Sequence, residues 1–166
     1  SLVGSEMCIR DSIILDIWER IGKITNWDLV IIGDGCIRQK LEQTVRDKQI
    51  QRVSFTGQVN HPEEYYKSAK IILLTSSFEG FPMCLIEALR FGVIPLTFDI
   101  SAGVRSIVSN SGGIIIKNRN SNEMFLKLQE LINNKYLHLL SEKARLKSNR
   151  YTLNRIGEQW INLLRK

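Results

Sequence analysis

The sequence predicts an α/β fold in which a parallel sheet of about five strands carries helices on both faces. Two observations support this prediction. Short apolar runs rich in Val and Ile, each closed by Gly, Ser or Asp, are typical of strands buried in a parallel sheet. Helical patterns alternate with these runs, which indicates strands joined by helical crossovers. With 166 residues, of which 43% are hydrophobic and 24% charged, the chain has the composition of one globular domain.

Five apolar runs are strong enough to be strands. They span residues 28–32, 52–56, 71–75, 93–98 and 113–116. A sixth run, Leu2-Val3-Gly4, is too weak to count. The predicted helices span residues 13–24, 36–48, 61–69, 82–91, 101–109, 121–133, 135–149 and 152–164. Pro62 and Pro82 stand where proline fits the first turn of a helix, and Gly92 stands where glycine ends one.

The first dozen residues do not resemble the rest of the chain. They show neither strand nor helix periodicity, and they resemble an adaptor read-through at the end of a conceptual translation. We therefore divide the chain into a leader, residues 1–12, whose nativeness is open, and a domain, residues 13–166, that is incomplete at its N-terminus.

The net charge of +6 is concentrated at the C-terminal end. Residues 135–166 carry eight Lys or Arg against Glu142 and Glu158, which accounts for the whole excess. A solvated basic helix face is the usual explanation of such a pattern, and contact with an anionic membrane surface is the alternative. We expect no nucleic-acid partner.

Cysteine and histidine usage does not indicate a metal site or a disulfide framework. Cys8, Cys36 and Cys84 are widely spaced and have no His at ligand spacing, and His61 and His138 lie far apart. No apolar run reaches the roughly 18 residues that a membrane span needs. The N-terminus also lacks the pattern of a signal peptide, so the expected location is cytoplasmic.

The segment after the predicted strand 71–75 is the strongest candidate for a ligand site. Ligands of open α/β sheets bind at the carboxyl ends of strands, where loops lead into helix N-termini. Here the loop leads into a helix starting near Pro82, whose first amides lack partners within the helix and suit a diphosphate. Gly80 allows close backbone approach. The carboxylate of Glu79 could hold sugar hydroxyls or cap the following helix.

Glu87 lies one and a half turns inside this helix among apolar neighbours. An unpaired carboxylate buried there would be costly, so Glu87 needs a partner. Two readings remain open from spacing alone: an ion pair with Arg90, three residues further along the same helix face, or contact with the ribose of a nucleotide.

The run from Glu79 to Glu87 resembles the signature of retaining glycosyltransferases of family 4, which have the GT-B architecture of two Rossmann-like domains. The resemblance covers about residues 13–164. It includes residues 30–35 (VIIGDG), residues 53–59 (VSFTGQV) and Trp160, which fall where the family's C-terminal domain has similar residues. It implies one half of a GT-B fold.

The resemblance also implies roles for individual residues. Glu79 would be the catalytic-site residue that binds hydroxyls of the donor sugar, and Glu87 would hold the ribose. The other donor-binding residues would be Gly80, Phe81, Pro82, Met83, Cys84 and Leu85 along the loop and helix, and Gly57 and Val59 beside the base. The donor would be a UDP-, GDP- or ADP-sugar, used with retention and without a metal ion.

The sequence also departs from the family pattern. Family members carry a Gly-Arg pair and a nearby Lys after their first strand, and these cations bind the donor's phosphates. Here that stretch falls on the leader, where Arg10 is the single candidate substitute. We expect the sheet to lack its first strand, which would leave a central gap and an exposed apolar seam.

The family's N-terminal acceptor domain is absent as well, so we expect the isolated chain to be inactive. The last helix, with Ile156, Trp160, Leu163 and Leu164 on one face, would either pack against that domain or be ordinary core. We expect marginal stability or self-association of the chain.

Other functions remain open at this point. A nucleotide-sugar epimerase of GT-B architecture and a non-catalytic nucleotide-binding module both fit the predicted fold. A nicotinamide-dependent oxidoreductase fits less well, because Arg38 stands where the third glycine of a Gly-x-Gly-x-x-Gly turn should be.

Overall fold

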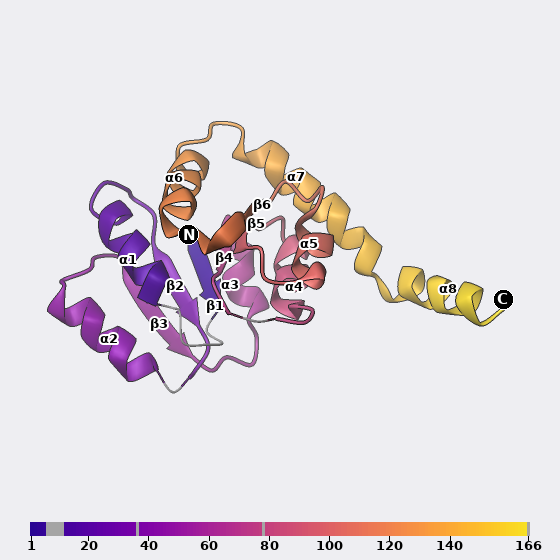
Figure 1. Ribbon diagram of the computed structural model, residues 1–166, viewed down its shortest axis with the longest axis horizontal. Helices are drawn as coiled ribbons and strands as arrows, with labels where there is room; N and C mark the ends of the chain where they lie inside the picture. The colour runs from indigo at the N-terminus through magenta and orange to yellow at the C-terminus, as the bar shows by residue number, and fades with distance from the viewer. Residues whose placement is uncertain (6–11, 36, 78, 166) are drawn as a thin grey trace.

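The computed structural model describes residues 1–5, 12–35, 37–77 and 79–165. Its centre is a six-stranded sheet in the order β3-β2-β1-β4-β5-β6, with every neighbouring pair parallel (Figure 1). The strands are β1 (Leu2–Ser5), β2 (Leu29–Ile32), β3 (Val53–Gly57), β4 (Ile71–Leu74), β5 (Ile94–Phe98) and β6 (Ile114–Ile116). The α/β class and the five strands predicted beyond residue 12 are confirmed.

All predicted helices are present, with ends that differ by a few residues. They are α1 (Ser12–Ile21), α2 (Arg38–Asp47), α3 (Glu63–Ser68), α4 (Met83–Arg90), α5 (Ala102–Val108), α6 (Ser121–Ile132), α7 (Leu137–Ser148) and α8 (Leu153–Leu164). The short 3-10 turns η1 (Lys117–Arg119) and η2 (Asn149–Tyr151) follow β6 and α7.

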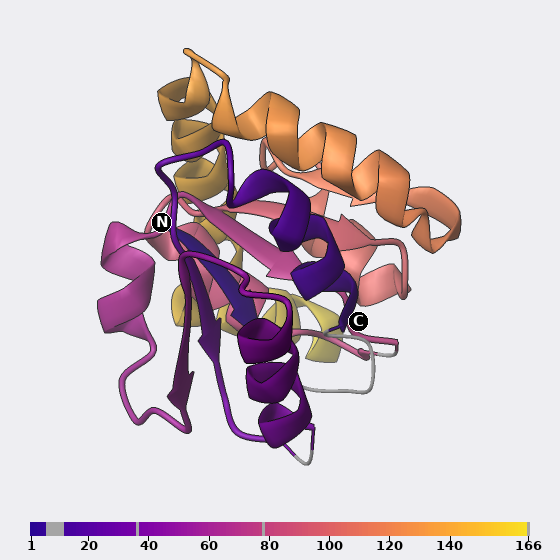
Figure 2. The same ribbon diagram turned by 90° about the vertical axis from the view of Figure 1, so that its left-hand side faces the viewer.

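Helices cover both faces of the sheet, as predicted. One core joins the strands to buried side chains of α1, α2 and α6, and a second core joins them to α3, α4, α5 and α7. In Figure 2, α3 (magenta) lies on one side of the strands and α1 and α2 (dark purple) lie on the other. Trp18 of α1 is fully buried, and its indole N–H donates to the carbonyl of Gln51 at 3.0 Å.

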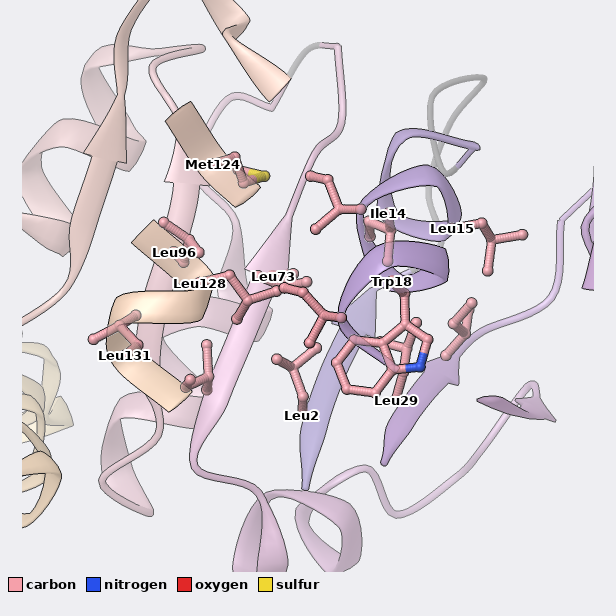
Figure 3. Packing of buried hydrophobic residues seen from close by; sticks show 14 of the residues in the cluster. Leu2, Ile14, Leu15, Trp18, Leu29, Leu73, Leu96, Met124, Leu128 and Leu131 are labelled. Atoms are coloured by element: carbon pink, nitrogen blue, oxygen red, sulfur yellow. The ribbon is translucent and has the colours of Figure 1, made fainter. Parts of the chain in front are cut away.

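The expectation of a missing first strand is wrong. β1 occupies the central position, with Leu2 in register with Leu29 of β2 and with Ile71 of β4. Leu2 is fully buried beside Trp18 (Figure 3). The run is short, so its own sequence pattern is weak. Pairing on both sides satisfies its backbone and closes the seam that the sheet would otherwise expose.

Helix α8 extends away from the body of the molecule after α7 ends (Figure 1). None of its residues is buried, and the side chains of Ile156, Trp160, Leu163 and Leu164 are between 38% and 79% exposed. The reading of this apolar face as ordinary core is therefore wrong. Its packing against a further domain stays a prediction.

Candidate functional site

The loop between β4 and α4 lies at the carboxyl edge of the sheet, where Glu79 and Gly80 precede the first turn of α4. Pro82 is the N-cap of α4 with an extended backbone (φ −73°, ψ 105°), and the helix begins at Met83. The first amides of α4 have no carbonyl of the same helix to bind. This arrangement presents backbone donors and the positive end of the helix dipole at the loop, which suits an anion.

Two neighbouring segments hold this loop in place. Arg119 of η1 donates a hydrogen bond to the carbonyl of Ser77. Ser101, the N-cap of α5, donates from its hydroxyl to the carbonyl of Gly80 at 3.3 Å. Gly103 lies so close that an added Cβ would stand 2.1 Å from the Gly80 oxygen. The loop is therefore fixed from β6 and from α5.

The sequence analysis did not identify Arg119, Ser101 or Gly103. One signal was available, because segments that follow β5 and β6 also end at the carboxyl edge of the sheet. The conformation of η1, the turn after β6, could not be predicted from the sequence. Asn118 and Arg119 both have positive φ, at 53° and 50°, which non-glycine residues rarely adopt.

The predicted site residues of this loop differ in how far their side chains are exposed to solvent. Glu79 is half-buried, and Phe81 and Met83 are 49% and 57% exposed. Among the residues that the structure describes, the Glu79 carboxylate has no hydrogen bond and α4 has no side-chain cap. The helix-capping reading of Glu79 is therefore wrong, and its carboxylate is available to a ligand.

Pro82 and Leu85 face inward. Leu85 is fully buried in the second core, with a relative exposure of 0%, and Pro82 is buried as well. The side chains of these residues cannot line a donor, so only their backbone groups could contact one. Cys84 is half-buried.

Glu87 lies on α4 opposite α3. It is half-buried and lines a groove of about 590 Å³ together with Asn60, Pro62, Glu63, Tyr66, Arg90 and Phe91. No ion pair joins Glu87 to Arg90 in the described part of the chain. The ion-pair reading is therefore wrong, and the Glu87 carboxylate faces the groove unpaired.

Tyr66 forms part of the same groove. Burial raises the pKa of its hydroxyl, and the neighbouring Cys84 and the carboxylate of Glu87 raise it further. Tyr66 therefore stays protonated at neutral pH and can donate a hydrogen bond beside Glu87.

The loop after β3 closes the other side of the groove. Gly57 is buried with φ +71°, and its carbonyl accepts from the Gly33 amide at 3.0 Å, which joins the ends of β2 and β3. Val59 is half-buried, and Asn60 reaches the groove. The structure thus brings Glu87 and Asn60 to one groove, while Gly57, Val59 and Glu79 are not among the residues that line it.

Two kinds of feature are absent from the described residues. No group of three or more His, Cys, Asp or Glu is placed to hold a metal ion within this part of the chain. No helix of the same residues is long and apolar enough to cross a bilayer. Arg10, the candidate phosphate-binding cation, falls in residues 6–11, outside the described residues.

The comparison with known protein families decides the affiliation. The family model described as "Glycosyl transferases group 1" matches residues 12–152. The chain belongs to this family. The fold of this glycosyltransferase chain matches the C-terminal halves of GT-B enzymes, as the family resemblance implied.

Relatives of this glycosyltransferase chain extend well beyond it. An uncharacterized glycosyltransferase of Haemophilus influenzae is 34% identical over 155 residues, which are 91% of this chain and 44% of that protein. The amylovoran biosynthesis glycosyltransferase AmsD of Erwinia amylovora is 30% identical over 154 residues, covering 91% and 43%. The chain spans less than half the length of these relatives.

Solved glycosyltransferases have the same fold. The crystal structure of TarM matches with a TM-score of 0.85 and 28% identity, over 99% of this chain and 35% of TarM. The lipopolysaccharide outer core galactosyltransferase WaaB matches with a TM-score of 0.82 and 22% identity, over 98% and 48%. At that identity the match to WaaB shows the fold alone.

Proposed function

We propose that this chain is the donor-nucleotide half of a retaining glycosyltransferase. The complete enzyme would transfer a hexose or a similar sugar from a UDP-, GDP- or ADP-sugar to a saccharide or lipid-linked acceptor. The observation that carries the proposal is the unpaired Glu87 carboxylate, which faces a groove between α4 and the loop after β3. A carboxylate there can accept both hydroxyls of a ribose whose base lies against Gly57 and Val59.

The groups around Glu87 fit the rest of such a donor. The first amides of α4, near Met83 and Cys84, would bind the diphosphate, with the backbone of Pro82 and Leu85 beside them. Glu79 would accept hydrogen bonds from the sugar hydroxyls, with Gly80 and Phe81 in backbone contact. A TarM mutant that is 29% identical to this chain was solved in complex with UDP. This relative supports a nucleotide donor here.

The missing parts of the reaction would come from outside this chain. A further acceptor-binding domain would close the cleft against the carboxyl edge of the sheet and cover the apolar face of α8. Positive groups that offset the charge of the leaving diphosphate are needed for catalysis. We therefore propose that the isolated chain is inactive and self-associates through α8. A monomer at all concentrations in analytical ultracentrifugation would contradict the self-association.

The proposal places the enzyme in the cytoplasm, with the basic helices α7 and α8 against an anionic membrane surface. Residues 135–166 carry eight Lys or Arg against two Glu, and this excess of positive charge would attract anionic lipid. Flotation of the full-length protein with vesicles containing anionic lipid, compared with neutral vesicles, tests this contact. Equal recovery with both vesicle types would refute it.

Calorimetric titration of the full-length protein with UDP, GDP and ADP tests the donor site. A carboxylate that accepts hydrogen bonds from a ribose contributes about 1.5–3 kcal/mol, so Glu87→Gln should weaken nucleotide binding roughly tenfold or more. Glu79→Gln should leave the affinity for the bare nucleotide unchanged and weaken binding of the nucleotide sugar. Glu64→Gln is the control, since Glu64 pairs with Lys67 on exposed α3 surface and does not line the groove.

If the wild-type protein binds none of the nucleotides, the donor-site proposal fails. A second candidate, a non-catalytic nucleotide-binding module, is favoured by one observation. The stretch that carries the phosphate-binding cations in the family contains Arg10 alone. Nucleotide binding without sugar transfer or donor hydrolysis by the full-length protein would favour that candidate.

A further inference from the structure

A second pocket lies beside the donor loop, which is the loop between β4 and α4 that carries Glu79, Gly80 and Phe81. Its volume is about 380 Å³, and residues from α4, α5, α7, η2 and α8 line it. The lining residues are Phe81, Met83, Ile86, Ser106, Lys147, Arg150, Tyr151, Ile156 and Gln159. Neither Glu79 nor Glu87 is among them, so this pocket differs from the groove proposed for the nucleotide.

Positive charge without a counter-charge distinguishes this pocket. Lys147 is 7% exposed and lines the cavity. Within the part of the chain that the structure describes, the side chains of Lys147 and Arg150 make no hydrogen bond and no ion pair. None of the lining residues is acidic. The side chain of Lys147 is largely buried, and the partial desolvation of its ammonium group together with the neighbouring Arg150 lowers the pKa of Lys147. An anion in the pocket would supply the missing partner.

Aromatic rings form another wall of the pocket. Phe81 and Tyr151 meet edge to face, with ring centroids 6.1 Å apart. The hydroxyl of Tyr151 donates to the carbonyl of Ser106 at 3.2 Å, which fixes the ring against α5. A site with aromatic walls and a few convergent polar groups suits a small organic ligand better than a bare ion. The flat rings can pack against the C–H face of a sugar.

We propose that this pocket binds an anionic saccharide, with the phosphate or carboxylate of the sugar between Lys147 and Arg150 and its ring against Phe81 and Tyr151. Both oxyanions accept charge-assisted hydrogen bonds from these cations. Because Phe81 also belongs to the donor loop, the bound saccharide lies next to the proposed donor sugar. The anion site itself does not depend on the proposed transfer reaction.

Calorimetry on the full-length protein tests the site with glucose 1-phosphate and with glucuronate. Saturating UDP fills the nucleotide site during these titrations, and glucose serves as the neutral probe. We expect at least one of the two anions to bind and glucose not to bind, and the anion that binds more tightly identifies the oxyanion. If UDP itself does not bind, the donor proposal fails, and the same titrations without UDP still test the pocket.

Lys147→Met keeps the buried stem and removes the charge, so it should weaken binding of the anion roughly tenfold or more. Arg150→Gln changes an exposed residue and gives a second measurement if Lys147→Met does not fold. Lys143→Gln is the matched control, because Lys143 is on α7 but outside the pocket, and it should bind the anion as the wild type does.

Three results would overturn the proposal. In the first, neither anion binds the wild-type protein. In the second, Lys147→Met and Arg150→Gln both bind the anion with wild-type affinity. In the third, inorganic phosphate binds more tightly than both sugar anions, which would mean that the pocket recognises a bare ion.

Discussion

Arg119 offers the sharpest test of how the loop between β4 and α4 is held. Its guanidinium donates to the carbonyl of Ser77, which is 42 residues away in the sequence and directly precedes the Glu79 loop. Arg119→Ala removes this donor. Alanine is as disfavoured at positive φ as arginine, so the difference between the wild type and the variant measures the loss of the guanidinium. A hydrogen bond from a charged donor contributes about 1.5–3 kcal/mol. Because Arg119 is only half-buried, solvent screening should reduce the loss of stability below this range, to about 1 kcal/mol.

Two measurements check this expectation. Urea unfolding followed by circular dichroism should show a lower midpoint with an unchanged slope. Calorimetry should show weaker binding of the nucleotide sugar, because the loop that carries Glu79 is less well fixed before binding. The binding experiment uses the full-length protein.

Lys117→Ala is the control for Arg119→Ala. Lys117 belongs to the same short turn and is exposed, and its side chain makes no hydrogen bond or ion pair among the described residues. Our reasoning would be refuted if Arg119→Ala unfolded at the wild-type urea midpoint and bound the nucleotide sugar as the wild type does. An equal loss in Lys117→Ala would also refute it, since the effect would then belong to the turn.

Three further changes test the packing around the site. Gly103→Ala should destabilise the fold by about 1–3 kcal/mol, because its Cβ would meet the Gly80 carbonyl; Gly157→Ala in open space should be neutral or stabilising by thermal melting. The raised pKa of Tyr66 means that the unfolded state ionises first, so stability falls as pH rises above about 10; Tyr66→Phe should flatten this fall in urea titrations between neutral and alkaline pH. Thr97→Val should raise the melting temperature, because the buried Thr97 hydroxyl has no partner among the described residues, and a lower melting temperature would contradict this.

The sequence predicted most helices and strands because their apolar periodicity is local. β5 is buried along its whole length and α4 has Pro at its N-cap, and both features stand out in a short window. β1 could not be predicted in this way, because Leu2–Ser5 is stabilised by pairing with β2 and β4, which begin far along the chain. No window around Leu2 contains that information.

The same distinction applies to the site. The position of Glu79 and Glu87 followed from the rule that ligands meet the carboxyl ends of strands. The choice between an ion pair and a free carboxylate at Glu87 did not follow, because residues three apart on a helix can pair or point apart. The structure separates Glu87 from Arg90 along one groove, and side-chain directions of this kind depend on the packing of α3 against α4.

The contact between Phe81 and Tyr151 connects η2, which precedes α8, to the loop between β4 and α4. Tyr151 packs against Phe81 and is fixed by Ser106 of α5, and α8 begins two residues after Tyr151. Anything that binds the exposed face of α8 and moves this helix would also move Tyr151, because only Thr152 separates the two. Because Phe81 follows Glu79 by two residues, a displacement of Tyr151 would reach the loop between β4 and α4 through one aromatic contact. The loop is thus held by Arg119 of η1, by Ser101 of α5 and by the ring of Tyr151 in η2, and the third of these supports lies next to the exposed helix α8.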